Sequence, residues 1–202
     1  MPFGTDSERG SCTDPANRAT RNRKDEAMAD RVVESSDVQV PEIPEILEKV
    51  LLFSLEEAKE KMLEGSDVVP FTALVVKDNL FIENHPGESA EECFNFARHT
   101  VQNARGADAY ALCYDGYVEI DDGTKDALIA EGGVPGEDEG YAVGFLYETD
   151  DEGKLVFEEE AAYIGESPNF MVALKSADAY DEDEIDDKYL DDGEDEEEAE
   201  EE

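Results

Sequence analysis

The chain has 202 residues and a mass of 22.3 kDa, and 56 acidic side chains against 16 basic ones give it a formal net charge of -40. This charge repels phosphate backbones and anionic lipids, so no direct binding to nucleic acid and no membrane binding is expected. The length allows one domain of about 100–150 residues with polar ends, and no apolar run reaches the roughly 18 residues of a membrane-spanning helix.

Three cysteines, Cys12, Cys93 and Cys113, cannot all pair within one chain. No apolar stretch near the first residues resembles a secretory signal. We therefore expect a cytoplasmic protein with reduced thiols.

Residues 1–40 are predicted to form a disordered arm, because Pro, Ser, Asn and charged residues dominate them. Residues 1–27 hold five basic and five acidic side chains, whereas the rest of the chain carries the whole net negative charge. This break leads to the hypothesis that residues 1–27 are an overextended start and that Met28 begins the native protein. A native peptide that crosses Ala27 and Met28, detected by mass spectrometry, would refute it.

Residues 41–66 form a predicted helical segment with two short helices. The first is indicated by apolar residues at helical spacing, namely Ile43, Ile46, Leu47, Val50 and Leu51. The second is expected over residues 54–65, because Ser54 and Glu57 have the spacing of a capping box and Gly65 suits the position after a helix.

Residues 67–175 are predicted to form an α+β domain that starts with a β-hairpin. Its apolar runs, 71–76 and 80–82, are separated by Lys77, Asp78 and Asn79, which favour a turn. A long amphipathic helix should follow, because one face at a period of 3.6 residues is apolar. That face comprises Ala90, Cys93, Phe94, Ala97, Val101 and Ala104.

Four further strands are predicted, at residues 109–120, 126–131, 141–149 and 155–164. Short turns rich in Gly and Asp join them, apart from one longer loop, Gly132–Gly140, so consecutive strands should run antiparallel. The expected fold is an antiparallel sheet of about six strands in the order ββαββββ, covered by one amphipathic helix and preceded by two short helices.

The sequence "ETDDEGKLVFEE" resembles a calcium-binding loop when Gly153 takes the sixth position. Its candidate ligands are Glu148, Asp150, Glu152 and Glu159. The flanking residues alternate as strands do, whereas such a loop needs helices on both sides, so a hairpin turn is the favoured interpretation. We expect no metal and no cofactor.

Two other kinds of site are disfavoured by spacing and charge. His85, His99, Cys93 and Cys113 contain no C-x-x-C pair for zinc, and surrounding carboxylates disfavour a reactive thiolate. The loop Gly132–Gly140 has no Lys for a phosphate, although it could close over a cleft that holds paired carboxylates.

Residues 176–202 contain 17 acidic side chains and one Lys, so this tail is predicted to be disordered. Four apolar residues interrupt the acids and could dock on a basic, partly apolar protein: Tyr180, Ile185, Tyr189 and Leu190. The leading hypothesis is a non-enzymatic interaction or regulatory module that engages basic proteins.

Two alternatives remain open at this point. One is a small hydrolase-like enzyme that uses paired carboxylates. The other is adaptation to salt or selection for solubility with no dedicated partner, because residues 41–177 also hold 31 acidic against nine basic side chains. The sequence leaves the oligomeric state and the identity of any partner open.

Overall fold

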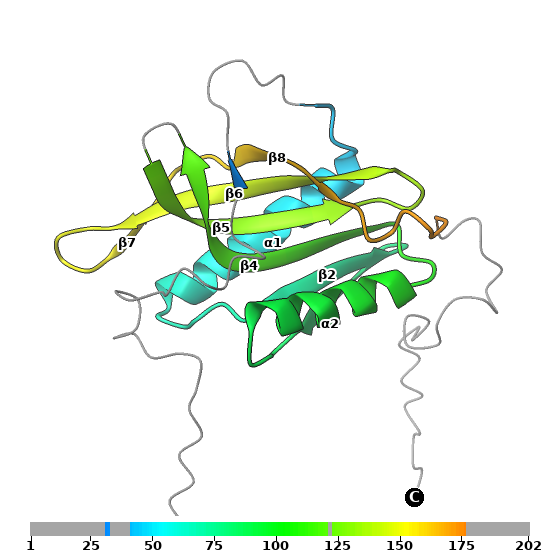
Figure 1. Ribbon diagram of the computed structural model, residues 1–202, viewed down its shortest axis with the longest axis horizontal. Coiled ribbons are helices and arrows are strands. Elements are labelled where there is room, and N and C mark those ends of the chain that lie inside the picture. The colour runs from blue at the N-terminus through cyan, green and yellow to red at the C-terminus, as the bar shows by residue number, and fades with distance from the viewer. Residues whose placement is uncertain (1–30, 33–40, 121–122, 177–202) are drawn as a thin grey trace, which may run out of the picture.

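An antiparallel sheet lies between two helices in the computed structural model, which describes residues 31–32, 41–120 and 123–176 (Figure 1). In chain order, the elements are β1 (Arg31–Val32), α1 (Glu45–Leu63), β2 (Phe71–Val76), β3 (Asn79–Asn84), α2 (Ala90–Asn103), β4 (Ala109–Ile120), β5 (Gly123–Gly133), β6 (Glu139–Thr149), β7 (Leu155–Phe157) and β8 (Ala162–Pro168). Neighbouring strands follow the order β3-β2-β4-β5-β6-β7, while β8 pairs with β6 and β1 pairs with β4 in parallel. None of the described helices is long and apolar enough to cross a bilayer.

The predicted α+β class is confirmed, with eight strands among the described residues instead of about six. The prediction that residues 1–40 are disordered is wrong at Arg31–Val32, because these residues form β1 and pair with β4. Helices cover both faces of the sheet, whereas one covering helix was expected. The α1 side of the sheet gathers Phe71, Ala73, Ala109, Ala111, Cys113, Leu128, Ala130, Val143, Phe145 and Tyr147. The opposite side gathers Leu74, Val76, Tyr110, Leu112, Tyr114, Val118, Ala127, Ile129, Ala142 and Ile164, together with residues of α2. The central strands therefore alternate between two apolar cores.

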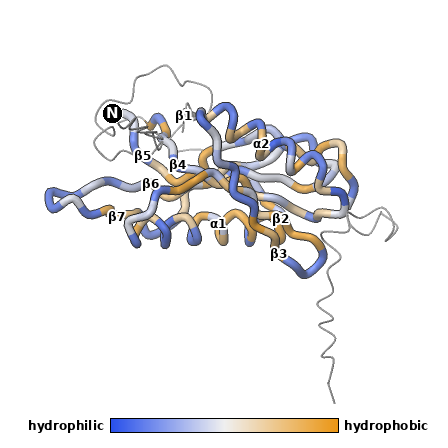
Figure 2. Tube along the Cα trace, turned by 90° about the horizontal axis from the view of Figure 1, so that it is seen from below, coloured by the Kyte–Doolittle hydropathy of each residue, from blue (hydrophilic) through white to orange (hydrophobic). Residues whose placement is uncertain are grey.

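The prediction of two short helices between residues 43 and 65 is wrong, because α1 is one continuous helix. Ser54 does not cap a second helix: its side chain is buried and its hydroxyl donates to the Val50 carbonyl oxygen at 2.8 Å. The continuous apolar face of the helix outweighs the local capping signal. It consists of Leu47, Val50, Leu51, Leu55, Ala58 and Met62, and the tube of α1 in Figure 2 alternates accordingly between hydrophobic and hydrophilic residues.

The end of α1 agrees with the sequence. Gly65 has a φ of +85°, and its amide and that of Ser66 donate to Met62 and Lys61 carbonyl oxygens at 3.0 Å. Glycine takes this left-handed conformation without steric cost, so it ends the helix as predicted. Leu63, the last residue of α1, is 58% exposed.

The predicted hairpin and long helix are confirmed as β2–β3 and α2. Val76 pairs with Asn79, which shortens the turn to Lys77 and Asp78. Ser89 caps α2, since its hydroxyl oxygen accepts from the Glu92 amide at 3.2 Å. The predicted strand at 155–164 is wrong as one element: it divides into β7 and β8, which both pair with β6.

The loop predicted at Gly132–Gly140 is shorter, because both of its ends belong to the strands β5 and β6. A Cβ atom at Gly132 would collide with the Tyr110 carbonyl oxygen, and one at Gly140 with the Gly132 carbonyl oxygen. Glycine therefore lets these backbones approach closely.

Replacing Ser54 by alanine tests the continuity of α1. We expect Ser54→Ala to raise the free energy of unfolding by about 0.5 kcal/mol, because alanine has the higher helix propensity and the serine hydroxyl only bonds back to its own helix. Urea denaturation followed by circular dichroism measures the change. The matched control is Ser89→Ala, which removes a real cap and should cost about 1 kcal/mol. A loss of that size at Ser54 would contradict one continuous helix.

Candidate protein-binding surfaces

Acidic side chains lie on the outside of the described fold. Glu131 is the one buried acid among the residues that the structure describes, at 5% exposure. The Tyr114 hydroxyl donates to its carboxylate at 2.7 Å. Burial of a carboxylate requires such partners, which explains why the remaining acids stay at the surface.

The calcium-loop candidates lie on a β-hairpin that extends beyond the rest of the described fold (Figure 1). Glu148 belongs to β6, Glu152 lies in the turn, and Glu159 follows β7. The Asp150 carboxylate accepts from the Glu152 and Lys154 amides at 2.9 and 2.8 Å, so it closes the turn. Among the described residues, no cluster of His, Cys, Asp or Glu has the arrangement of a metal site. This geometry matches the predicted hairpin turn.

The two described cysteines lie on opposite sides of the sheet. Cys113 is buried against α1, whereas Cys93 is buried on α2. Burial raises the pKa of the Cys113 thiol and keeps it protonated, so it cannot act as a ready nucleophile. Their separation by the sheet rules out a zinc site shared by both thiols.

His85 is buried beside β2, with its Nε2 atom 2.9 Å from the Thr72 hydroxyl. Burial lowers the pKa of its imidazole, and the negative charge of Glu83 opposes this effect. His99, in contrast, is exposed on α2. The structure thus gives His85 a packing role in the β2–β3 hairpin.

Hydrogen bonds from Asn169 hold the connection between β5 and β6 in place. The Asn169 amide donates to the carbonyl oxygens of Val134 and Glu137, both at 2.8 Å. Its side chain occupies the space that a Cβ atom at Gly133 would need. The connection is therefore held against the residues that follow β8, and it brings no pair of buried carboxylates together among the described acids.

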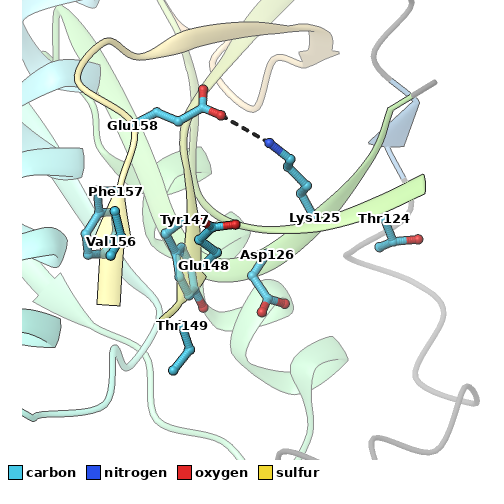
Figure 3. Close-up of a pocket in the computed structure, with 9 residues that line it drawn as sticks. All are labelled: Thr124, Lys125, Asp126, Tyr147, Glu148, Thr149, Val156, Phe157 and Glu158. Atoms are coloured by element: carbon cyan, nitrogen blue, oxygen red, sulfur yellow. Dashed lines mark hydrogen bonds and ion pairs between the residues drawn. The ribbon is translucent and has the colours of Figure 1, made fainter. Parts of the chain in front are cut away.

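A shallow depression of about 410 Å³ lies where β5, β6 and β7 meet (Figure 3). It is lined by Thr124, Lys125, Asp126, Tyr147, Glu148, Thr149, Val156, Phe157 and Glu158. The rings of Tyr147 and Phe157 lie 5.1 Å apart, and Lys125 is 3.3 Å from the Glu158 carboxylate. The Lys59 ammonium lies 4.4 Å from the centre of the Phe145 ring and 5.6 Å from that of Phe157. Aromatic rings and carboxylates together suit a cationic side chain with an apolar stem.

The two edges of the sheet differ. On one side, β7 has three residues, and β8 is irregular beside Ala142 and Val143 and ends at Pro168. On the other side, β3 pairs with β2 over six consecutive residues without a bulge. The sequence indicated the hairpin but not that one of its strands is a regular sheet edge. The lack of Pro and Lys in "NLFIEN" is the signal that could have shown it.

The tail candidates Tyr180, Ile185, Tyr189 and Leu190 lie outside the described residues, as do residues 1–27. Neither the partner-binding prediction nor the hypothesis about the start is therefore tested by the structure. No protein-family model, curated protein or solved structure matches this chain. No function can be carried over from a relative.

The buried imidazole makes stability depend on pH. Because the pKa of His85 is lower in the folded protein than the usual 6.5, the unfolded chain binds the proton first as the pH falls. The stability that neutral His85 contributes is therefore complete above about pH 6.5 and is lost as the pH falls toward the lowered pKa.

The many carboxylates also respond to acid, so the test compares two proteins. We expect the wild type to lose stability relative to His85→Gln between about pH 7 and pH 5. Chemical denaturation at each pH measures both. If the free energies of unfolding of the two proteins changed by the same amount across this range, His85 would not be buried in its neutral form.

Proposed function

We propose that this protein is a non-enzymatic interaction module that binds basic proteins mainly through its acidic tail, with the acidic surface of the folded domain adding to the attraction. The observation that carries the proposal is the tail, residues 176–202, in which apolar side chains interrupt 17 acidic ones and a single Lys. Residues 41–177 add 31 acidic against nine basic side chains, and the described acids other than Glu131 are not buried. Four of the lysines, Lys49, Lys61, Lys125 and Lys154, already form ion pairs. The surplus carboxylates attract a cationic surface over about 8 Å at physiological salt.

The depression beside β7 supports the proposal, since it offers a place for one basic side chain. Asp126 pairs across the strands with Tyr147, and Tyr147 pairs with Phe157, so this carboxylate shares a face with both rings, whereas the Glu158 carboxylate points to Lys125 (Figure 3). An arginine or lysine there would gain both charge attraction and ring contact. The three carboxylates that line the depression are exposed to solvent, and this form of binding requires no catalytic group.

The acidic tail supplies most of the binding in this proposal. Residues 176–202 carry a net charge of -16, and the four apolar residues of the tail supply contacts that charge alone does not. The tail increases the rate at which a basic partner is met, and its apolar residues slow the release of the partner.

Affinity capture from a native extract tests this function. The immobilised full chain should retain basic proteins at low salt and release them as the salt concentration rises, with an affinity loss of about tenfold or more between 50 and 300 mM. A chain that ends at Ser176 should lose most of this binding. Mass spectrometry identifies the bound proteins, and their net charge provides the readout.

A charge-matched control separates the effect of apolar contacts from that of charge attraction. In the full chain, Tyr180, Ile185, Tyr189 and Leu190 are all replaced by serine, which leaves the net charge unchanged. This variant should still capture basic proteins but release them at lower salt. Equal capture of basic proteins by the chain that ends at Ser176 would contradict the role of the tail. Capture without regard to protein charge would contradict the binding of basic proteins and favour a purely solubilising role.

A further inference from the structure

The outer edge of β3 presents backbone groups that no described strand uses. The Val75 carbonyl oxygen accepts from the Asp108 amide at 2.7 Å, so Val75 faces β4. Its cross-strand partner, Leu80, therefore faces away from β2. The His85 amide donates to the Pro70 carbonyl oxygen at 2.7 Å. Because hydrogen bonding alternates along an antiparallel pair, the backbone groups of Glu83 and Phe81 also point toward β2. The N–H and C=O groups of Leu80 and Ile82 accordingly point out of the sheet.

The side chains of β3 differ between its two faces. Leu80 and Ile82 lie opposite Val75 and Ala73, on the α1 side, and they are 40% and 43% exposed. Glu83 lies on the α2 side, where its carboxylate is 3.4 Å from the Thr100 hydroxyl. The edge thus has an apolar α1 side and a negative charge on the α2 side.

A further apolar side chain lies beside the same edge. Phe96 is one helical turn before Thr100, so both lie on the side of α2 that reaches β3. Phe96 is 47% exposed. Three large exposed apolar side chains therefore lie at β3, namely those of Leu80, Ile82 and Phe96.

Natural proteins protect regular edges, because an open row of backbone groups pairs with other chains. The opposite edge has such protection in its short β7, its irregular β8 and Pro168. The edge at β3 has no Lys, no Pro and no bulge over its six residues. This contrast within one sheet indicates that β3 is kept open for a partner.

We propose that β3 binds an extended segment of a basic partner protein, which adds one strand to the sheet through the outward groups of Leu80 and Ile82. The segment alternates apolar and basic residues: the apolar ones contact Leu80 and Ile82 on the α1 side, and the basic ones reach Glu83 on the α2 side. This inference rests on the proposed function, because it names the form that a basic partner takes at one site. The net charge of -40 favours such a segment over a second copy of the chain, which would bring an equal charge.

The probe is a short peptide of alternating valine and lysine with N-methyl groups on its lysine amides. In an antiparallel pair with β3, the valines lie opposite Leu80 and Ile82, and their free amides point at this edge. The control peptide carries the N-methyl groups on the valine amides instead. Composition and charge stay equal, but the pairing edge is blocked. We expect the control to bind the full chain about tenfold more weakly or worse in fluorescence anisotropy.

Two variants of the full chain complete the test. Ile82→Pro removes an N–H that points away from β2, so the hairpin should stay folded by circular dichroism while the probe loses about tenfold in affinity. Ile82→Glu adds a negative charge and should lose a similar factor, whereas charge attraction alone would make it bind more tightly. If the proline variant does not fold, the affinity of Ile82→Glu for the probe alone tests strand addition.

The possible outcomes separate this inference from the proposed function. Equal binding of both peptides, or unchanged affinity in Ile82→Glu, overturns strand addition; if that binding still weakens steeply with salt, the basic-partner function stands. If neither peptide binds at low salt, both proposals fail. A dimer of the free chain in light scattering that dissociates in Ile82→Glu assigns the edge to a second copy and overturns the inference.

Discussion

The burial of both faces of β4, β5 and β6 is the constraint on which the rest of the structure depends. Apolar side chains alternate along these strands, so one set packs on α1 and the other lies on the α2 side. At about 25 cal/mol per Å² of apolar area, such two-sided burial has to offset both chain entropy and the repulsion among surplus carboxylates. Acids are therefore excluded from the interior, and Glu131 is buried only with a hydrogen bond from Tyr114.

This exclusion also shapes the surface. Carboxylates that cannot enter the cores spread over the exposed faces, and few lysines are left to neutralise them. The central strands are fixed by their two cores, so differences between binding surfaces arise at the sheet edges and at the β6–β7 hairpin. The depression beside β7 combines rings with acids, while β3 combines a free backbone edge with Leu80 and Ile82. Both arrangements suit a cationic, partly apolar partner.

Periodicity was sufficient to predict the elements that bury one clear stripe or one alternating face. The long helix α2, the β2–β3 hairpin and the strand β4 follow from such patterns, as does the end of α1 at Gly65. The false break at Ser54 arose because a capping box is a local signal, whereas burial of the whole α1 face is decided by contacts with strands far along the chain. The same limit hid the division between β7 and β8, because each of these strands is defined by its own pairing with β6.

The binding surfaces were less predictable than the fold. A count of charges indicates a basic partner, but it does not say which strand is an edge, because the strand order depends on pairing between distant segments. The calcium-like spacing around Gly153 lies on a hairpin turn, in which the Asp150 carboxylate accepts the amides of Glu152 and Lys154. The tail residues, from Tyr180 to Leu190, belong to the part of the chain that the structure does not describe.

Hydrogen exchange of the β3 amides in the free, full-length protein shows whether the outer edge of β3 is open to a partner strand. We expect an alternating pattern, in which the Phe81 and Glu83 amides are protected by β2 while those of Leu80 and Ile82 exchange rapidly. On addition of a basic partner, the Leu80 and Ile82 amides should become protected as well. Slow exchange at all four amides before any partner is added would show that the edge is already covered, and the account would be wrong.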